Sequence, residues 1–265
     1  MIVRGTIAGV AEILARKHTY TQPPDFGPGP NVTFEDASSV FAWPLLLFVG
    51  GLFLIILFVY LSYASKQRRR MGFIQMARQL NLTYSEQDTF GLLGYPFELF
   101  HKGDGRGVEN VLHGAWQEVD VVAFDYWYYN ESTDSKGGTS RSYYRYDCVL
   151  VPMPADCPHL TIDRENVFSR LADALSFRDI QFESEAFNRE FTVQCEVPKF
   201  ANDLIDARMM QWLQATGSGH AYEVVGNRVL VVGPKIDPQA FTELLGVARG
   251  FVQHVPKVVP SLYPG

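Results

Sequence analysis

Two aspartates are the residues of this sequence best placed for acid–base chemistry. Asp125 lies in Val119–Tyr129, which has the composition of a β-strand, and the polar loop that follows is centred on Lys136-Gly137. If a hairpin is symmetric about that dipeptide, Asp125 faces Asp147 or Cys148 on the next strand. Two facing carboxylates repel each other, which raises the pKa of one of them and produces an arrangement that acid–base catalysts use.

The sequence also offers structural interpretations of this pair. Arg141 or Arg145 could neutralise the two carboxylates, or one carboxylate could face water. His113 stands on a predicted strand without an evident partner, and it completes the set of candidate catalytic residues Asp125, Asp147 and His113. The sequence leaves enzymatic activity open and favours its absence.

Searches for established catalytic and cofactor motifs return none. The chain lacks a G-x-x-x-x-G-K-[ST] phosphate loop, a G-x-S-x-G elbow and an H-E-x-x-H metal motif. The residues that resemble soft metal ligands are Cys148, Cys157, His159 and Cys195, and no C-x-x-C pair organises them. We therefore expect no metal and no cofactor.

Aromatic residues are concentrated in the two strands that carry the aspartates. They are Tyr126, Trp127, Tyr128, Tyr129, Tyr143, Tyr144 and Tyr146. Sheets that bind single-stranded RNA stack bases on such rings, but they surround the rings with basic residues. Residues 80–265 carry 15 basic and 25 acidic residues, so we expect cross-strand aromatic packing, no nucleic-acid binding, and a residual patch for a protein partner.

The chain divides into three parts of different composition: an N-terminal tail, an apolar run, and the C-terminal domain that contains these strands. Ala37–Ser65 contains no charged residue. This run is long enough to supply the roughly 20 apolar residues that a helix needs to cross the hydrocarbon layer of a bilayer. Trp43 at one end and Tyr60 and Tyr63 at the other are placed as interfacial aromatic residues. The sequence predicts a single transmembrane helix within residues 40–65.

The charges that flank this run predict its orientation. Basic residues follow it directly, at Lys66, Arg68, Arg69 and Arg70. Acidic residues precede it, so the N-terminus should lie outside the cell and the C-terminal domain in the cytoplasm, beneath the plasma membrane. We predict that the four basic residues form a lipid-facing flank, either as an orientation signal alone or also as a clamp on anionic lipids.

The predicted domains follow from these boundaries. Residues 1–39 form an outer tail with a short amphipathic helix over residues 2–16 and a Pro/Gly linker, and residues 256–265 form a C-terminal tail. Residues 66–255 form the cytoplasmic domain. Its segments alternate irregularly between strand and helix patterns, which predicts an α+β fold with a mainly antiparallel sheet and packed helices.

Several elements of that domain can be placed by pattern. Val119–Tyr129 is apolar on both faces and should be a central strand. We expect a strand at Pro96–His101, a helix at Asn166–Ser176 and one helix over Phe200–Gln214. Gly226-Asn227 predicts the turn of a hairpin.

Three further segments carry a resemblance to a known group of proteins. They are Asn110–Leu112 with Val121–Tyr126, Asp179–Phe191, and Asp206–Leu213. Together they resemble an uncharacterised actinobacterial membrane-anchored family, a bacterial domain of unknown function with one or two membrane helices before a cytoplasmic domain. The resemblance covers residues 72–255 and implies architecture without an activity.

Three functions are compatible with these observations. The first is a membrane-anchored protein whose acidic cytoplasmic domain binds a protein partner or acts as an accessory subunit. The second is an enzyme of unrecognised type that uses Asp125, Asp147 or His113. The third is a transmembrane sensor that acts through the N-terminal tail. We expect the lipid bilayer and a protein to be the partners.

Overall fold

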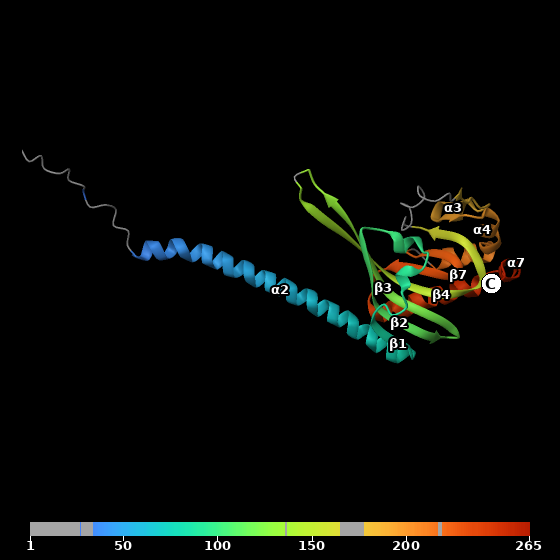
Figure 1. The fold of residues 1–265 in the computed structure, drawn as a ribbon, viewed down its shortest axis with the longest axis horizontal. Helices are drawn as coiled ribbons and strands as arrows, with labels where there is room; N and C mark the ends of the chain where they lie inside the picture. Colours follow the sequence, from blue (N-terminus) through green and yellow to red (C-terminus); the bar gives the residue numbers. More distant parts are fainter. Residues whose placement is uncertain (1–26, 28–33, 136, 165–177, 217–218) are drawn as a thin grey trace, which may run out of the picture. The chain divides into compact units, whose positions relative to one another are not determined.

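The computed structural model describes residues 27, 34–135, 137–164, 178–216 and 219–265. The predicted helices over residues 2–16 and Asn166–Ser176 therefore lie outside the described residues. The chain forms two units, Met1–Tyr60 and Leu61–Gly265. Helix α2, Phe34–Leu80, supplies residues to both of them (Figure 1).

The described part of the first unit is an apolar stretch of α2. Its side chains from Leu46 to Tyr60 are exposed, among them Phe58 at 72% and Ile55 at 62%. Among the described residues, one helix is long and apolar enough to cross a membrane, and it is this one. An exposed stripe of this size is unfavourable in water, so the finding agrees with a membrane span.

The second unit is built on one antiparallel sheet of seven strands. Its order is β1-β2-β3-β4-β6-β5, and β7 also pairs with β4. The strands are β1 Thr83–Gln87, β2 Gly105–Trp116, β3 Val119–Thr133, β4 Thr139–Asp163, β5 Arg178–Asp179, β6 Thr192–Cys195 and β7 Ala221–Pro234. All pairings are antiparallel, so the predicted α+β class is confirmed.

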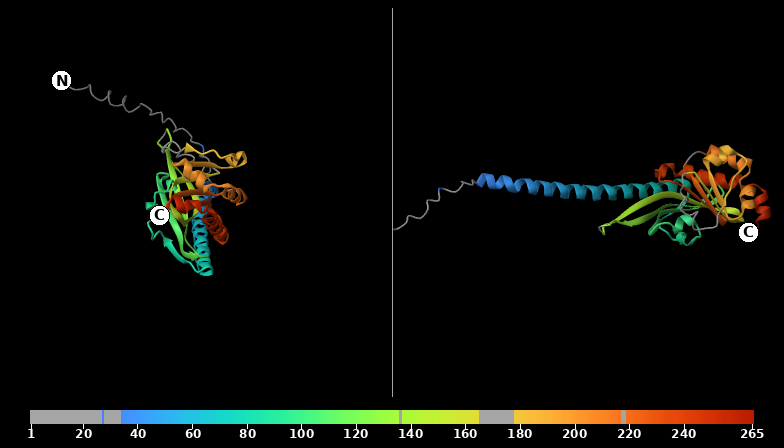
Figure 2. Two further views of the ribbon diagram at one scale, coloured as in Figure 1. Left: turned by 90° about the vertical axis from the view of Figure 1, so that its right-hand side faces the viewer. Right: turned by 90° about the horizontal axis from the view of Figure 1, so that it is seen from above.

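Helices cover one face of this sheet and short 3-10 turns cover the other (Figure 2). The face that the helices cover is packed against the C-terminal end of α2 and five further α-helices. These are α3 Glu185–Glu190, α4 Pro198–Leu204, α5 Ala207–Ala215, α6 Phe241–His254 and α7 Val258–Leu262. The 3-10 turns on the other face are η1 Leu92–Gly94 and η2 Glu98–His101. A third turn, η3 Pro238–Ala240, lies on the helical face between α2 and α6.

Two hydrophobic cores result, one on each face. The larger one joins the helices to inward residues such as Ala123 and Val149, and the smaller one joins η1 and η2 to Phe124 and Leu150. Adjacent residues of β3 and β4 thus belong to opposite cores, as the alternation of side chains in a strand requires. The prediction that Val119–Tyr129 is a central strand is confirmed, and cover on both faces is complete over Ala123–Tyr126.

The second unit also contains the end of the long helix. Phe73, Met76 and Ala77 of α2 are at most 4% exposed and belong to the larger core. Phe73 packs edge-on against Phe241 of α6, with ring centroids 5.2 Å apart. Gly72 lets Pro238 approach, because a Cβ there would lie 2.9 Å from the proline ring. The last turns of α2 are therefore a structural element of the α+β unit.

Some predicted elements differ from the structure. The predicted hairpin at Gly226-Asn227 is wrong, because β7 runs unbroken along β4, and Gly226 adopts a φ of 56° beside a register shift. The predicted strand Pro96–His101 is instead the 3-10 turn η2. The predicted helix Phe200–Gln214 is divided into α4 and α5, and Asp206 caps the second by accepting the Met209 N–H.

The predicted C-terminal tail, residues 256–265, is packed in the structure. It contains α7, whose Val259 is fully buried. The Tyr263 ring packs edge-on against Phe200 at 5.0 Å, and its hydroxyl donates to Asp203 at 2.9 Å. These residues therefore belong to the α+β unit.

Candidate functional site

The strands β3 and β4 bring the two predicted aspartates together. Asp125 pairs in register with Asp147, which confirms one of the two partners that the hairpin symmetry predicted. Asp147 is fully buried and Asp125 is 8% exposed. Both side chains lie on the face of the sheet that α2 covers.

The cation that neutralises this pair comes from α2. Arg69 Nη2 lies 2.6 Å from Asp125 Oδ1 and 2.6 Å from Asp147 Oδ1, and its Nε lies 2.7 Å from Asp125 Oδ2. The expected neutralisation by Arg141 or Arg145 is therefore not what the structure shows. Arg69 is 56 residues from Asp125 in sequence, and no local pattern connects them.

Further groups complete the hydrogen bonds of this cluster, which we call the Arg69 cluster (Arg69, Asp125 and Asp147). Arg69 Nη1 donates to the Ile236 carbonyl, and the Ile236 N–H donates to Asp147 Oδ2 at 2.8 Å. Asn110 donates to Asp125 Oδ2 at 2.9 Å. The cluster thus ties α2, β2, β3, β4 and the segment after β7 to one point.

The balance of charges in the cluster perturbs one carboxyl group. Burial, followed by the nearby charge of Asp125, raises the pKa of Asp147 from 3.8 to about 7, against the opposing effect of Arg69. One guanidinium cannot fully compensate two buried carboxylates, so the pair holds a proton near neutral pH. All four carboxylate oxygens of Asp125 and Asp147 accept hydrogen bonds from protein donors, which is the pattern of a structural ion network.

This raised pKa predicts how stability depends on pH. The folded chain binds the Asp147 proton more tightly than the unfolded chain, so that contribution is complete below pH 4 and is lost as the pH rises through 7. We expect the free energy of unfolding of the full chain in nanodiscs to fall by on the order of 1 kcal/mol between pH 6 and pH 8. Asp147→Asn should remove this slope in melting temperature, and an unchanged slope in the variant would contradict the assignment.

His113 does not join this cluster. It lies on β2 opposite Val122, three residues along β3 from Asp125, and its ring packs edge-on against Phe90 at 4.8 Å. Of the three candidate catalytic residues, the structure brings Asp125 and Asp147 together and places His113 apart from them.

A second buried polar cluster was missed by sequence reasoning. Glu223 of β7 is fully buried and accepts the N–H groups of Glu98 and Leu99, and it lies 2.9 Å from His159 Nε2. Burial, followed by the Glu223 charge, raises the pKa of Glu98. The cluster fastens η2 to the sheet, so Glu223 acts as a structural acceptor.

Beyond the Arg69 cluster, β3 and β4 continue as a ribbon (Figure 1). The strand β2 flanks it as far as the Gly105–Tyr129 pair, and from Asn130 onward the ribbon has two strands. One face of it, which we call the aromatic face, carries Trp127, Tyr129 and Tyr143. Trp127 and Tyr129 stack at 6.4 Å over Gly107 and Gly105 of β2, where a Cβ would collide with each ring. Tyr126, Tyr128, Tyr144 and Tyr146 point the other way into the smaller core, so the predicted cross-strand packing holds there.

Arginines accompany the aromatic face. Arg141 lies 4.7 Å from the Tyr129 ring and pairs with Glu131, and Arg145 lies 5.8 Å from the Tyr143 ring. Tyr143 is 52% exposed. The ribbon therefore presents Trp, Tyr and Arg side chains to the surroundings of the second unit.

The four basic residues predicted as one lipid-facing flank have different surroundings. Arg69 is directed into the α+β unit and is engaged by Asp125 and Asp147, so it differs from that expectation. Arg70 pairs with Glu86 of β1 at 2.7 Å. Lys66 and Arg68 are exposed and make no ion pair with a described residue.

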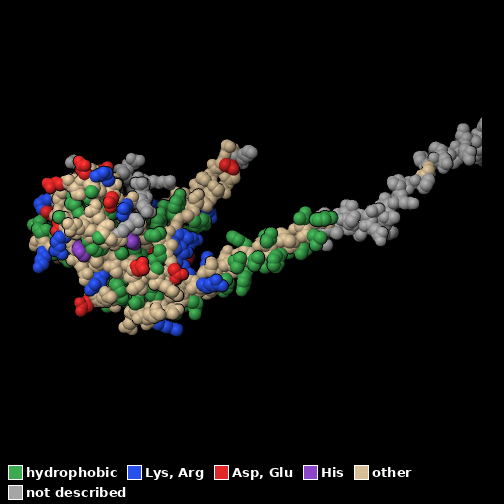
Figure 3. Space-filling model, turned by 180° about the vertical axis from the view of Figure 1, so that it is seen from behind, with side chains coloured by type: hydrophobic (Ala, Val, Ile, Leu, Met, Phe, Trp, Pro, Cys, Tyr) green, Lys and Arg blue, Asp and Glu red, His purple; other side chains and the backbone are tan. Residues whose placement is uncertain are grey.

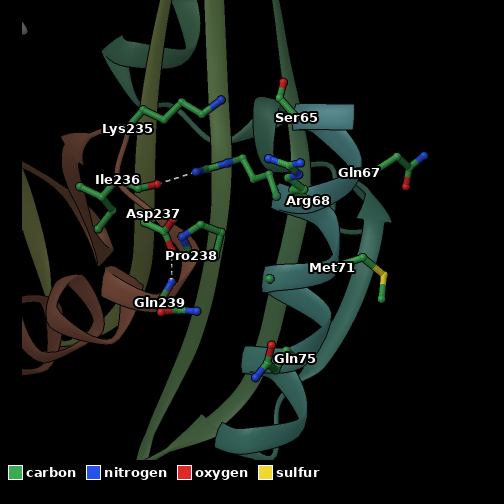
Figure 4. A pocket seen from close by; sticks show the side chains of 12 residues that line it. Ser65, Gln67, Arg68, Met71, Gln75, Lys235, Ile236, Asp237, Pro238 and Gln239 are labelled. Atoms are coloured by element: carbon green, nitrogen blue, oxygen red, sulfur yellow. Dashed lines mark hydrogen bonds between the residues drawn. The ribbon is translucent and has the colours of Figure 1, made fainter. Parts of the chain in front are cut away.

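The second unit has hollows beside the α2 residues that belong to it, and Lys and Arg side chains gather on this part of the surface (Figure 3). One of them, of about 800 Å³, lies between α2 and the segment after β7 (Figure 4). A smaller one, of about 320 Å³, lies between α2 and the strands β2 and β3. Ser65, Arg69 and Lys235 line both. The sequence had suggested Arg145 only as a counter-charge for the two aspartates, and it had not singled out Lys235.

The predicted interfacial aromatic residues are all exposed. Trp43 is 71%, Tyr60 65% and Tyr63 62% exposed. The three cysteines are buried free thiols. Among the described residues, no group of three or more His, Cys, Asp or Glu side chains is arranged to hold a metal ion.

The described residues thus define a class of protein: a chain with one helix able to span a membrane and an α+β unit that incorporates the end of that helix. No family model matches the chain, and no curated protein matches it. Among solved structures, "crystal structure of the mycobacterial trehalose monomycolate transport factor A, TtfA" is similar at 13% identity and a TM-score of 0.48. That match covers 72% of this chain and 95% of the other. The actinobacterial family assignment stays a proposal.

Proposed function

We propose that this chain is a single-pass membrane protein with an outer N-terminus, whose cytoplasmic α+β unit acts as an interaction module or accessory subunit. The apolar helix supports the anchor. The orientation rests on the flanks: residues 40–79 carry five basic residues and no acidic one, whereas acidic residues precede the run. The plasma membrane is the proposed location.

The observation that carries the interaction role is the aromatic face of the β3–β4 ribbon. Trp, Tyr and Arg are the residues that dominate binding energy at protein interfaces, and here they share one exposed face. Tyr143 has no covering element and is half exposed, whereas most large aromatic residues of the unit are buried. Rings already stacked on glycines are held rigidly, so binding would order few side chains.

The same face indicates the chemistry of the partner. Arg145 is exposed and makes no ion pair with a described residue. Arg141 pairs with the exposed carboxylate of Glu131. A matching surface would offer apolar or aromatic groups flanked by carboxylates. We therefore propose a protein partner with an acidic and apolar patch.

Photo-crosslinking from a single position tests this role. A photoreactive amino acid in place of Tyr143, in the full chain in its native membrane, should capture a defined partner. The matched control is the same substitution at Leu262 on α7, which is 48% exposed against 52% for Tyr143. Equal capture patterns from the two positions, or none from Tyr143, would contradict the proposed interface.

Charge reversal supplies the quantitative prediction. Because Arg145 is exposed, Arg145→Glu should leave folding unchanged and reduce capture from Tyr143 by about tenfold or more, the range for a hot-spot arginine. Arg208→Glu on α5 changes the charge equally and should leave capture unchanged. Quantifying the crosslinked adduct by mass spectrometry checks both variants.

A further inference from the structure

The two hollows beside α2 share a wall that carries positive charge. The larger is lined by Arg68 and Lys235, and the smaller by Lys66, Arg145 and Lys235. Figure 4 shows the Lys235 side chain extending toward α2, where Ser65 and Arg68 lie. We call the combined feature the cationic pocket (Lys66, Arg68, Arg145 and Lys235).

Few anionic groups of the protein balance these cations. Asp125 lines the smaller hollow but is engaged by Arg69, which leaves Glu109 as its other acidic lining residue. Asp237 lines the larger hollow and accepts the Gln239 N–H. None of the four cationic side chains makes an ion pair with a described residue, so the pocket has more positive than negative charge.

The effect of this imbalance is seen at Lys235. Partial burial, and then the charges of Arg69 and Arg145, lower the pKa of its ammonium group. Positive groups held together in this way are stabilised by an added anion. Ser62 and Ser65 also line the smaller hollow. The Ser62 hydroxyl is a donor suited to phosphate oxygens, whereas the Ser65 hydroxyl donates to the Ser62 carbonyl at 3.0 Å.

We propose that the cationic pocket binds the phosphate group of an anionic phospholipid headgroup. Volumes of about 320 and 800 Å³ match a phosphate and its polar substituent. A lipid is the favoured source of the phosphate because of the chain position of the pocket. Ser65, which lines both hollows, is the last residue of the uncharged run 37–65, and Lys66 follows it.

The site shares Arg145 with the proposed protein interface, and its other residues are different. It lies at the base of the ribbon and uses residues of α2 and of the segment after β7, whereas the interface uses the aromatic face. Crosslinking from Tyr143 and lipid retention are separate measurements, so a failure of either one contradicts only its own proposal.

The test compares lipid retention by the full chain and two double variants. Lys235→Gln/Arg145→Gln removes two charges of the pocket, and Arg208→Gln/Lys257→Gln removes two exposed charges elsewhere. Each protein is reconstituted in nanodiscs of phosphatidylcholine with or without phosphatidylglycerol. Native mass spectrometry counts retained phosphatidylglycerol, and hydrogen exchange follows the amides of residues 235–239.

The proposal predicts retained phosphatidylglycerol and slower exchange at residues 235–239 for the wild type and the control variant. The pocket variant should retain about 10- to 30-fold less, as expected for two juxtamembrane cations. Equal retention by all three proteins would overturn the site. Inorganic phosphate is added at millimolar concentration to phosphatidylcholine nanodiscs as a separate arm. If it alone slows exchange at residues 235–239, the pocket binds a free anion and the lipid assignment is overturned.

Discussion

Replacing Arg69 with alanine should destabilise the α+β unit by about 3–5 kcal/mol, which is the effect of removing one partner from a buried ion network. The substitution would leave Asp125 and Asp147 facing each other at 8% and 0% exposure without their shared cation. Chemical unfolding of the full chain in nanodiscs, followed by tryptophan fluorescence, measures the change.

Arg70→Ala is the matched control for this prediction. Arg70 is the next residue, carries the same charge and also pairs with a carboxylate, but its partner Glu86 is 57% exposed. A surface pair contributes at most about 1 kcal/mol, so this variant should remain close to the wild type. Similar losses for Arg69→Ala and Arg70→Ala would show that the network does not hold α2 in place.

A combined variant separates unpaired charge from lost packing. Arg69→Met together with Asp125→Asn and Asp147→Asn removes the whole ion network at similar volume. Replacing all members of a buried ion network is often neutral, so most of the stability should return. The loss of stability in Arg69→Ala should also be smaller at pH 6 than at pH 8, because Asp147 is protonated at pH 6.

Phe73→Ala should produce the second large effect, a destabilisation of about 3–5 kcal/mol, typical of truncating a buried phenylalanine. Phe73 is fully buried, packs against Phe241 and lies 5.1 Å below the Arg69 guanidinium. Its truncation leaves a cavity where α2 meets α6. Hydrogen exchange of α6 amides in the full chain should accelerate together with the loss of stability.

Met71→Ala is the control on the same helix. Met71 is 61% exposed, so its truncation should change stability by less than about 0.5 kcal/mol. If Phe73→Ala also left stability and α6 exchange unchanged, the end of α2 would not be part of the folded unit.

The pairing of Asp125 with Asp147 could be predicted because it depends on local chain geometry. A hairpin centred near Lys136-Gly137 fixes the register, and period-two alternation fixes which residues share a face. The central position of Val119–Tyr129 was predictable for a related reason, since a strand apolar on both faces needs cover on both.

The role of Arg69 could not be predicted in this way. The run of basic residues after the apolar segment was interpreted as one lipid-facing group, but consecutive residues of a helix point in different directions. Tertiary packing sets which of them meets the sheet, and the burial of Phe73 one turn later turns Arg69 toward Asp125. Lys235 was missed because only the tertiary fold brings it beside Ser65 and Arg69 of α2, which are distant in sequence.

Two errors in the fold have local causes. Gly226-Asn227 carries the same signal for a hairpin turn as for a glycine at an irregularity within one strand, and the long β4 selects the second. At Pro96–His101, alternating apolar residues suggested a strand. Phe97 and Phe100, three residues apart, instead both enter the smaller core, which suits a 3-10 turn.

The orientation of the chain in the membrane is the central claim, and cysteine labelling tests it directly. Cys148, Cys157 and Cys195 are buried, so introduced thiols can be labelled over a low background. Gly27→Cys lies before the apolar run and has no neighbouring atoms within 4 Å, and Ser132→Cys lies on the exposed ribbon. A membrane-impermeant maleimide should label Gly27→Cys in intact cells and Ser132→Cys only after lysis. Labelling of Ser132→Cys in intact cells would contradict the account.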